Sequence, residues 1–183
     1  PEVYKSTYNF VHAKYAIVAR LTGNFVTDAS DSSGMNLYDL EEGTWSGEMI
    51  EAAGLEPDKL PDIKVSTAVV GEVLPTIADE VGLAPGTPVV IGGGDGCCAA
   101  TGAGVIKEGR AYNYVGSSSW IALATDKPIY DPTMRTFTWA HLIPGMFSPC
   151  GTMQAAGASY AWARNELAPL EIQLAKEQNV SAY

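Results

Sequence analysis

The sequence predicts an α/β protein, and three observations support this fold class. A short β-branched run, Pro88-Val89-Val90-Ile91, has the composition of a buried strand. A glycine run follows it directly, and residues 97–104 are then small and apolar enough for a closely packed helix. Over the rest of the chain, segments typical of strands alternate with segments typical of helices, which indicates an α/β arrangement.

The first 54 residues predict two helices separated by a polar segment. Apolar side chains recur every three or four residues between 4 and 21, which predicts one amphipathic helix that Gly23 ends. Residues 25–40 are small and polar and predict a loop that leads into a short strand at 35–38. Ser46 is a suitable N-cap for a second helix, which runs through Ala53 and is closed by Gly54.

Proline and glycine divide the next segment. Residues 57–61 predict a linker, residues 69–74 predict extended chain, and Pro75 suits the first turn of a helix that ends near Gly82. After the glycine run, we expect strands at 110–115 and 120–124, a second pair at 136–142 and 147–153, and helices at 154–167 and 169–178.

Composition and charge exclude several classes of protein. The 183 residues carry a net charge of −10, which disfavours nucleic acid, because such binding relies on Lys and Arg that neutralise phosphates. No window approaches 18 consecutive apolar residues, and no leader opens the chain, so neither a membrane span nor secretion is expected. The cysteines Cys97, Cys98 and Cys150 lack metal-ligand spacing and predict buried thiols in a reducing cytoplasm.

The glycine run Gly92 to Gly96 contains the candidate catalytic residue, Asp95. Glycines let a ligand approach the backbone closely, and a carboxylate at the end of a strand lies where α/β proteins bind ligands. The alternative is a tight turn in which Asp95 only caps the following helix. The run lacks the Lys-Ser/Thr pair of a Walker loop.

A second candidate is the turn Gly116-Ser117-Ser118-Ser119 between two predicted strands. Its amides and three hydroxyls offer donors for phosphate oxygens. The alternative is an ordinary hairpin turn of small polar residues.

Taken together, the motifs resemble the FGGY carbohydrate kinases, such as xylulose, gluconate and glycerol kinases. Residues 90–95 are similar to the motif before the second domain of that family, and residues 99–105 to its small-residue helix. Residues 111–119 resemble the hairpin that grips ATP phosphates, usually written Gly-Thr-Ser or Gly-Thr-Gly. Upstream, Arg20-Leu21-Thr22-Gly23 and residues 27–34 are similar to a stretch of the first domain.

The resemblance implies an actin-like, ribonuclease-H-like kinase fold, present in part. Residues 1–108 would end the first, sugar-binding domain, and residues 109–183 would start the second, ATP-binding domain. The family's opening Asp-x-Gly-Thr phosphate loop and its closing glycine-rich adenosine loop have no counterpart here. We therefore expect this segment alone to be inactive as a kinase.

The same resemblance implies roles for particular residues. Asp95 would be the general base, and Gly116, Ser117, Ser118 and Ser119 would bind the phosphates of ATP, which acts together with Mg²⁺. Substrate-lining residues would be Gly94, Asp28, Ser30 and Asp31, although the last three equally suit a capped loop. No residue is assigned as a metal ligand.

The expected substrate is a small sugar or polyol, with a xylulose-like pentulose favoured over gluconate, ribulose or fuculose-like compounds. No nucleic acid or membrane partner is implied, and a homodimer is left open. The rival hypotheses are a non-catalytic actin-like ATP-binding protein and an interaction domain. We expect structural roles for His12, His141 and the tryptophans Trp120, Trp139 and Trp162.

Overall fold

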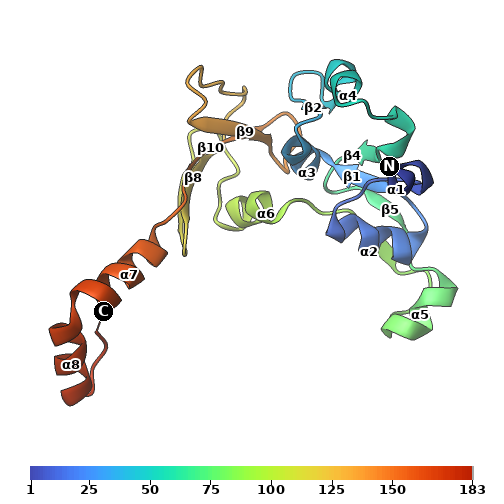
Figure 1. Cartoon of the computed structure of the whole chain (residues 1–183). Coiled ribbons are helices and arrows are strands. Elements are labelled where there is room, and N and C mark those ends of the chain that lie inside the picture. Colours follow the sequence, from blue (N-terminus) through green and yellow to red (C-terminus); the bar gives the residue numbers. More distant parts are fainter. Residues whose placement is uncertain (183) are drawn as a thin grey trace.

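Strands and helices are interleaved along the whole chain, as the sequence predicts, in a computed structural model that describes residues 1–182 (Figure 1). The first half contains α1 (Glu2–Ser6), α2 (Ala13–Thr22), β1 (Val26–Asp28), α3 (Ala29–Ser32), the 3₁₀ turn η1 (Ser33–Met35), β2 (Tyr38–Asp39), β3 (Thr44–Trp45), α4 (Gly47–Ala53), η2 (Pro57–Lys59), β4 (Asp62–Lys64), β5 (Val69–Glu72), α5 (Pro75–Val81) and β6 (Pro88–Val90). The second half contains α6 (Asp95–Gly102), β7 (Ala111–Val115), β8 (Ser119–Leu123), β9 (Thr136–Ala140), β10 (Phe147–Met153), α7 (Gly157–Leu167) and α8 (Pro169–Glu177).

The helix boundaries that rest on local chemistry agree with the sequence. The Ser46 side chain caps α4 by accepting a hydrogen bond from the Met49 amide, and Gly54 ends this helix in the left-handed region at φ 64°. Pro75 is the first residue of α5, and Gly82 ends it at φ 71°. Each boundary is fixed by residues within one turn of it.

The single helix predicted over residues 4–21 is wrong. The chain forms α1 and α2 instead, and Thr7 ends α1 with extended backbone. The Phe10 amide donates to the Lys59 carbonyl at 2.8 Å, so the segment between the helices is bonded to η2. This contact spans almost 50 residues of sequence, and helical periodicity carries no trace of it.

The loop predicted over residues 25–40 also contains regular structure. β1 pairs in parallel with β4, from Val26 opposite Asp62 to Asp28 opposite Lys64, and α3 follows β1 directly. β4 begins where the predicted linker at 57–61 ends. Two strands of three residues each were too short to give a period-2 pattern.

β6 confirms the strand predicted before the glycine run, but it is not fully buried. It pairs antiparallel with β5, and its Val90 side chain is 53% exposed. Ile91, just after the strand, is buried with Tyr15, Val18 and Val26 in the core of the first half. The glycine run therefore starts from a fixed point in this core.

The second half is built on one antiparallel sheet with strand order β7-β8-β10-β9. Both predicted hairpins are present, and α6 lies between this sheet and the first half (Figure 1). Ala100 of α6, Val105 and Ala124 form a second small core. α7 begins at Gly157, three residues later than predicted, and α7 and α8 extend away from the sheet.

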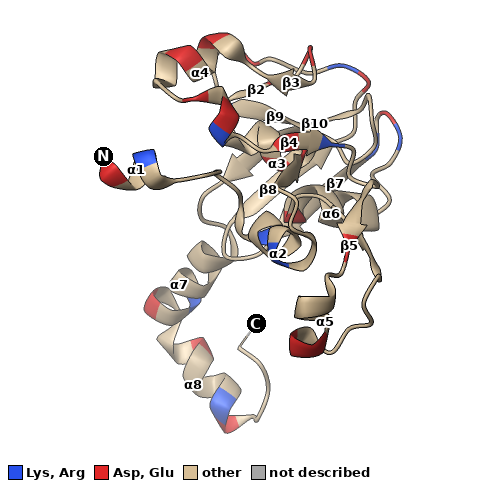
Figure 2. Cartoon of the chain, turned by 90° about the vertical axis from the view of Figure 1, so that its right-hand side faces the viewer, with Lys and Arg blue, Asp and Glu red and all other residues tan. Residues whose placement is uncertain are grey.

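Acidic residues lie on α4, α5, α7 and α8 as well as in loops, so the negative charge is spread over the molecule (Figure 2). Cys97 and Cys150 are buried, whereas Cys98 is exposed, which corrects the expectation of three buried thiols. Among residues 1–182, no helix has the length and apolar composition needed to cross a membrane.

Candidate functional site

A cavity of about 350 Å³ lies where the segment after β1, the start of α6 and one face of the sheet come together. Asp95 borders it, as do Ser30, Asp31 and Gly94, so the structure brings four predicted site residues to one place. The remaining lining residues are His12, Gly34, Gly96, Cys97, Tyr112, Trp120, Ala122, Phe137, Trp139, Ser148, Cys150 and Thr152.

Asp95 is the first residue of α6 and its side chain is exposed. Its Oδ1 accepts a hydrogen bond from the Gly96 amide at 2.8 Å. Gly94, and not Asp95, occupies the N-cap position. The carboxylate is thus held at the helix start and at the wall of a cavity, where it can accept a proton from a bound hydroxyl.

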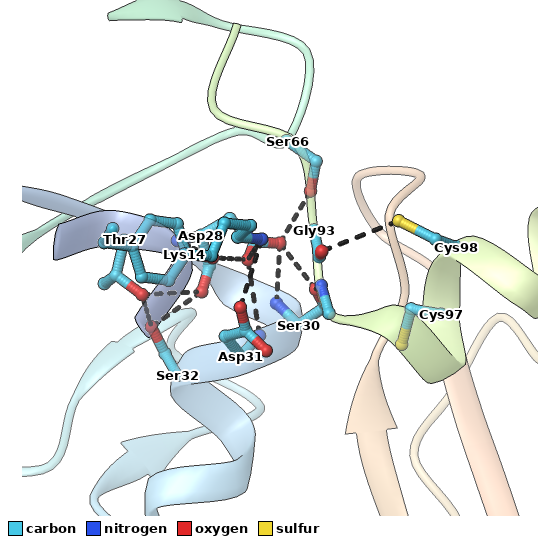
Figure 3. A network of polar contacts seen from close by, with 12 residues as sticks. Lys14, Thr27, Asp28, Ser30, Asp31, Ser32, Ser66, Gly93, Cys97 and Cys98 are labelled. Atoms are coloured by element: carbon cyan, nitrogen blue, oxygen red, sulfur yellow. Dashed lines mark hydrogen bonds and ion pairs between the residues drawn. The ribbon is translucent and has the colours of Figure 1, made fainter. Parts of the chain in front are cut away.

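Asp28 lies beneath the cavity and does not line it. Its side chain is fully buried and accepts hydrogen bonds from the Ser30 hydroxyl at 2.6 Å and the Ser66 hydroxyl at 2.7 Å (Figure 3). The Tyr15 hydroxyl donates to the same carboxylate. The Ser30 amide adds a further bond at 3.0 Å. Asp28 caps α3 in this way and joins α2, α3 and the segment before β5.

Electrostatics keep this cluster in one protonation state. Burial by itself would raise the pKa of Asp28, but the hydrogen bonds from two serines and Tyr15 outweigh it and hold the pKa below its usual range. Burial, together with the adjacent Asp28 carboxylate, raises the pKa of Tyr15. At neutral pH, Asp28 is therefore ionised and Tyr15 is a proton donor.

Ser30 connects this buried cluster to the glycine run. Its hydroxyl donates to Asp28 (Figure 3). The same hydroxyl accepts a hydrogen bond from the Gly94 amide at 2.8 Å. The approach is close: a Cβ on Gly94 would lie 2.8 Å from Asp31 Oδ1, and one on Gly93 would lie 1.9 Å from Leu142 Cδ2. Close packing, and not a left-handed backbone, is what requires glycine at these two positions.

Asp31 carries the partly exposed charge of the site. Its Oδ2 forms an ion pair with Lys14 Nζ at 3.1 Å, and Lys14 also lies 3.7 Å from Asp28 Oδ1. The Asp31 side chain is 23% exposed and faces the cavity, whereas that of Asp28 is not exposed at all. Asp31 is therefore the carboxylate of this segment that a bound ligand can reach.

The turn Gly116 to Ser119 lies outside the residues that line the cavity. The Gly116 carbonyl accepts a hydrogen bond from the Gly157 amide at 2.9 Å, and the Ser117 carbonyl accepts one from Ala156 at 2.9 Å, so the turn holds the start of α7. The Ser119 hydroxyl donates to the Tyr114 carbonyl at 2.8 Å. Among residues 1–182, the Ser117 and Ser118 hydroxyls have no hydrogen-bond partner, and no residue of the turn has a positive φ.

Aromatic side chains form much of the cavity wall, among them Trp120 and Trp139, for which the sequence predicts only structural roles. Trp120 Nε1 donates to the Tyr112 hydroxyl at 2.7 Å, and Phe137 and Trp139 pack edge to face with ring centroids 5.4 Å apart. A usable signal existed: Trp120 and Ala122, Phe137 and Trp139, and Ser148, Cys150 and Thr152 each alternate along a strand, which places them on one face. His141 is buried with both ring nitrogens bonded, which confirms its structural role.

Comparison with known proteins gives a consistent result. Residues 1–102 match the family described as the FGGY family of carbohydrate kinases, N-terminal domain. The autoinducer-2 kinase of Yersinia enterocolitica serotype O:8 is 30% identical over 184 aligned residues, which cover 100% of this chain and 35% of that protein. The chain thus spans about a third of the length of the curated relatives it matches.

Solved structures agree with the fold. The xylulose kinase from Rhodospirillum rubrum superposes with a TM-score of 0.87 at 29% identity, covering 97% of this chain and 36% of that one. The gluconate kinase from Lactobacillus acidophilus superposes with a TM-score of 0.86 at 26% identity, covering 91% and 34% of the two chains.

Proposed function

Because the chain belongs to the FGGY family of carbohydrate kinases, we propose that it is part of an enzyme that transfers the γ-phosphoryl group of ATP to a hydroxyl of a small sugar or polyol. The activity is proposed for the whole protein, of which this chain corresponds to about a third in the relatives. We assign residues 1–108 to the end of the sugar-binding domain and 109–183 to the start of the ATP-binding domain. The family match, which ends at residue 102, supports this division.

The observation that carries the proposal is the position of Asp95 at the wall of the cavity, beside Ser30 and Asp31. In the proposed reaction, a sugar hydroxyl attacks the γ-phosphorus, and its proton passes to the Asp95 carboxylate. The new bond joins the sugar oxygen to phosphorus, and the bond to the β–γ bridging oxygen breaks to release ADP. Positioning and charge stabilisation supply most of the rate enhancement in such transfers.

ATP and Mg²⁺ are assigned by the same reasoning. The Ser117 and Ser118 hydroxyls and the remaining amides of the turn are the proposed contacts of the ATP phosphates, whereas the Gly116 amide donates to the Ser118 carbonyl at 2.8 Å. Within residues 1–182, no three His, Cys, Asp or Glu side chains are grouped to hold a metal ion. We propose that Mg²⁺ enters with the ATP phosphates, since Mg²⁺ usually keeps several waters and few protein ligands.

For the substrate, we propose a sugar or polyol of the size of a pentulose, with xylulose favoured. The structural similarity to the xylulose kinase supports this choice, whereas the names of the other relatives point to different sugars or sugar derivatives. A panel of xylulose, ribulose, gluconate, glycerol and autoinducer-2, assayed with the intact enzyme by coupled ADP detection, identifies the preferred acceptor.

The variant Asp95→Asn tests the catalytic assignment. Asparagine keeps the shape of the side chain but cannot accept a proton, and a positioned general base contributes about 10²- to 10⁴-fold. We expect kcat of the intact enzyme to fall by about that factor, while calorimetric binding of the sugar is retained. The matched control is Asp79→Asn, which removes an exposed carboxylate on α5 away from the cavity.

Two results would contradict this assignment. Near-normal turnover of Asp95→Asn would leave Asp95 with a structural role at the start of α6 and would favour a non-catalytic ATP-binding protein. A large loss of sugar affinity with normal kcat at saturation would make Asp95 a binding residue. In either case, the control variant shows whether loss of one surface charge has any effect by itself.

A further inference from the structure

The Ser30 hydroxyl makes two hydrogen bonds of opposite direction at a buried position. Its proton goes to Asp28 Oδ2 at 2.6 Å, which leaves its lone pairs free to accept the Gly94 amide at 2.8 Å. The residue is 1% exposed, so water does not compete for either bond. A hydroxyl that donates to a carboxylate becomes a better acceptor, since such bonds are charge-assisted and strengthen one another.

The Asp28 carboxylate also fixes a second support of the glycine run. The Ser66 hydroxyl donates to Asp28 Oδ2 at 2.7 Å, while the Ser66 carbonyl accepts the Gly92 amide at 3.0 Å. Gly92 and Gly94 are thus each bonded to a serine that is itself bonded to Asp28. The two bonds differ in their acceptors: the Gly94 amide donates to the Ser30 hydroxyl, whereas the Gly92 amide donates to the Ser66 backbone carbonyl.

The other side of the glycine run is confined by the second half of the chain. Leu142 packs so closely on Gly93 that a Cβ there would lie 1.9 Å from Leu142 Cδ2. The Gly93 carbonyl accepts from Cys98 Sγ at 3.5 Å. The backbone before Asp95 is therefore held from both sides, and the Ser30 hydroxyl bonds the residue immediately before Asp95.

We propose that Asp28 and Ser30 are positioning residues for Asp95: the buried carboxylate orients the Ser30 hydroxyl, which fixes the Gly94 amide and so the backbone that carries Asp95. Neither residue touches the transferred group in this role. The proposal rests on the proposed catalytic function of Asp95. It assigns the serine-rich segment to the alignment of the base, in addition to any contact of Ser30 with substrate.

The test compares Ser30→Ala with Ser66→Ala in the intact enzyme. Each variant removes one hydroxyl that donates to Asp28, but only Ser30→Ala removes the bond to Gly94. Displacement of a catalytic group by about 1 Å can cost up to roughly 100-fold. For Ser30→Ala, we expect kcat to fall by about 10- to 100-fold, with the KM values for sugar and ATP changed little. Ser66→Ala keeps near-normal kcat.

Two further measurements separate positioning from a general structural effect. Hydrogen exchange of the Gly94 amide, measured in the intact enzyme without substrate, becomes faster in Ser30→Ala and not in Ser66→Ala. In the Asp95→Asn background, Ser30→Ala causes no further loss of kcat, because the two changes remove the same contribution.

Equal losses of kcat in the two serine variants would overturn the proposal, as would unchanged exchange at Gly94. A loss from Ser30→Ala that multiplies the loss from Asp95→Asn would also overturn it, because Ser30 would then act independently of Asp95. Full activity of Asp95→Asn would refute both the base and its positioning. The exchange measurement distinguishes these failures, since it reports the Ser30 to Gly94 bond without any turnover.

Discussion

Gly93 shows how a single missing side chain can join two parts of the chain. A Cβ on Gly93 would lie 1.9 Å from Cδ2 of Leu142, in the segment after β9, and 3.0 Å from Oγ of Ser30 in α3. Gly92, by contrast, is needed for its left-handed backbone at φ 69°, with nothing near its Cβ direction. Two adjacent positions of one motif thus require glycine for different physical reasons: close packing at Gly93 and a left-handed backbone at Gly92.

The variant Gly93→Ala tests this close packing. Adding a methyl group 1.9 Å from Leu142 Cδ2 forces Leu142 out of its packed position, and overpacking of this kind typically costs about 1–3 kcal/mol. We expect a lower unfolding temperature for the intact protein in differential scanning calorimetry. Gly47→Ala is the control, since nothing lies within 4 Å of a Cβ there.

A double variant makes the test specific to the contact with Leu142. Leu142→Ala removes the clashing atom, so Gly93→Ala should cost less in that background than in the wild-type protein. Strictly additive losses would contradict the proposed contact.

At the scale of single residues, the sequence identifies which side chains can carry chemistry, but it does not predict how deeply each of them is buried. Asp95 could be singled out because a strand, glycines and a helix of small residues are consecutive in the sequence. The burial of Asp28 could not be foreseen, since its partners Tyr15 and Ser66 lie 13 and 38 residues away. A segment predicted to line the sugar site therefore separates into cavity-facing Ser30 and Asp31 and a buried Asp28.

At the scale of elements, the sequence predicts the helices and hairpins that local signals determine, and it misses those that depend on long-range contacts. α4, α5 and the hairpin of β7 and β8 follow from caps, prolines and small polar turns, all of which act within a few residues. The break between α1 and α2 and the pairing of β1 with β4 depend on contacts between distant segments. The hydrophobic periodicity of a segment does not predict such contacts.

The variant Gly157→Ala tests whether the start of α7 positions the turn Gly116 to Ser119. A Cβ at Gly157 would lie 2.4 Å from the Gly116 carbonyl oxygen, which is a backbone atom that cannot rotate away. Alanine favours a helix over glycine by about 1 kcal/mol, so any harm must come from displacement of the turn. We expect a several-fold higher KM for ATP and an unchanged KM for the sugar.

Steady-state kinetics of the intact enzyme measure both constants. Gly102→Ala in α6 is the matched control, because nothing lies within 4 Å of its Cβ position. A change confined to the KM for the sugar would show that the turn is not part of the ATP site.

At the scale of the whole molecule, the two halves of the chain are joined by a few close contacts around the cavity. The Ala140 amide donates to the Ser33 hydroxyl at 3.1 Å, and a Cβ on Gly34 would lie 2.5 Å from Trp139. Together with Leu142 on Gly93, these contacts place β9 and its end against α3 and the glycine run. The wall of the cavity is thus made by residues from both halves of the chain.

His141, at this junction, gives the molecule a predicted dependence on pH. Its Nε2 bonds to the Val105 carbonyl at 2.9 Å and its Nδ1 accepts from the Ile143 amide at 3.0 Å, so the neutral ring is the form that fits. Burial lowers the pKa of His141, and this outweighs the opposing effect of the bond to Val105. A histidine in an unfolded chain titrates near about 6.5.

The direction of the pH effect on stability follows from the protonation of His141 in the folded protein and in the unfolded chain. Above about pH 6.5, His141 is neutral in both, and its contribution to stability is complete. As the pH falls below that value, the unfolded chain takes up a proton that the folded protein does not, so the free energy of unfolding decreases by at most about 1.4 kcal/mol per pH unit. We expect the unfolding temperature of the intact protein to fall between pH 6.5 and 5.5, and the variant His141→Gln to lose the part of this pH dependence that His141 causes.

His12→Gln replaces the other histidine of the chain and is the control. If His141→Gln kept the full wild-type slope over this interval, a group other than His141 would be responsible.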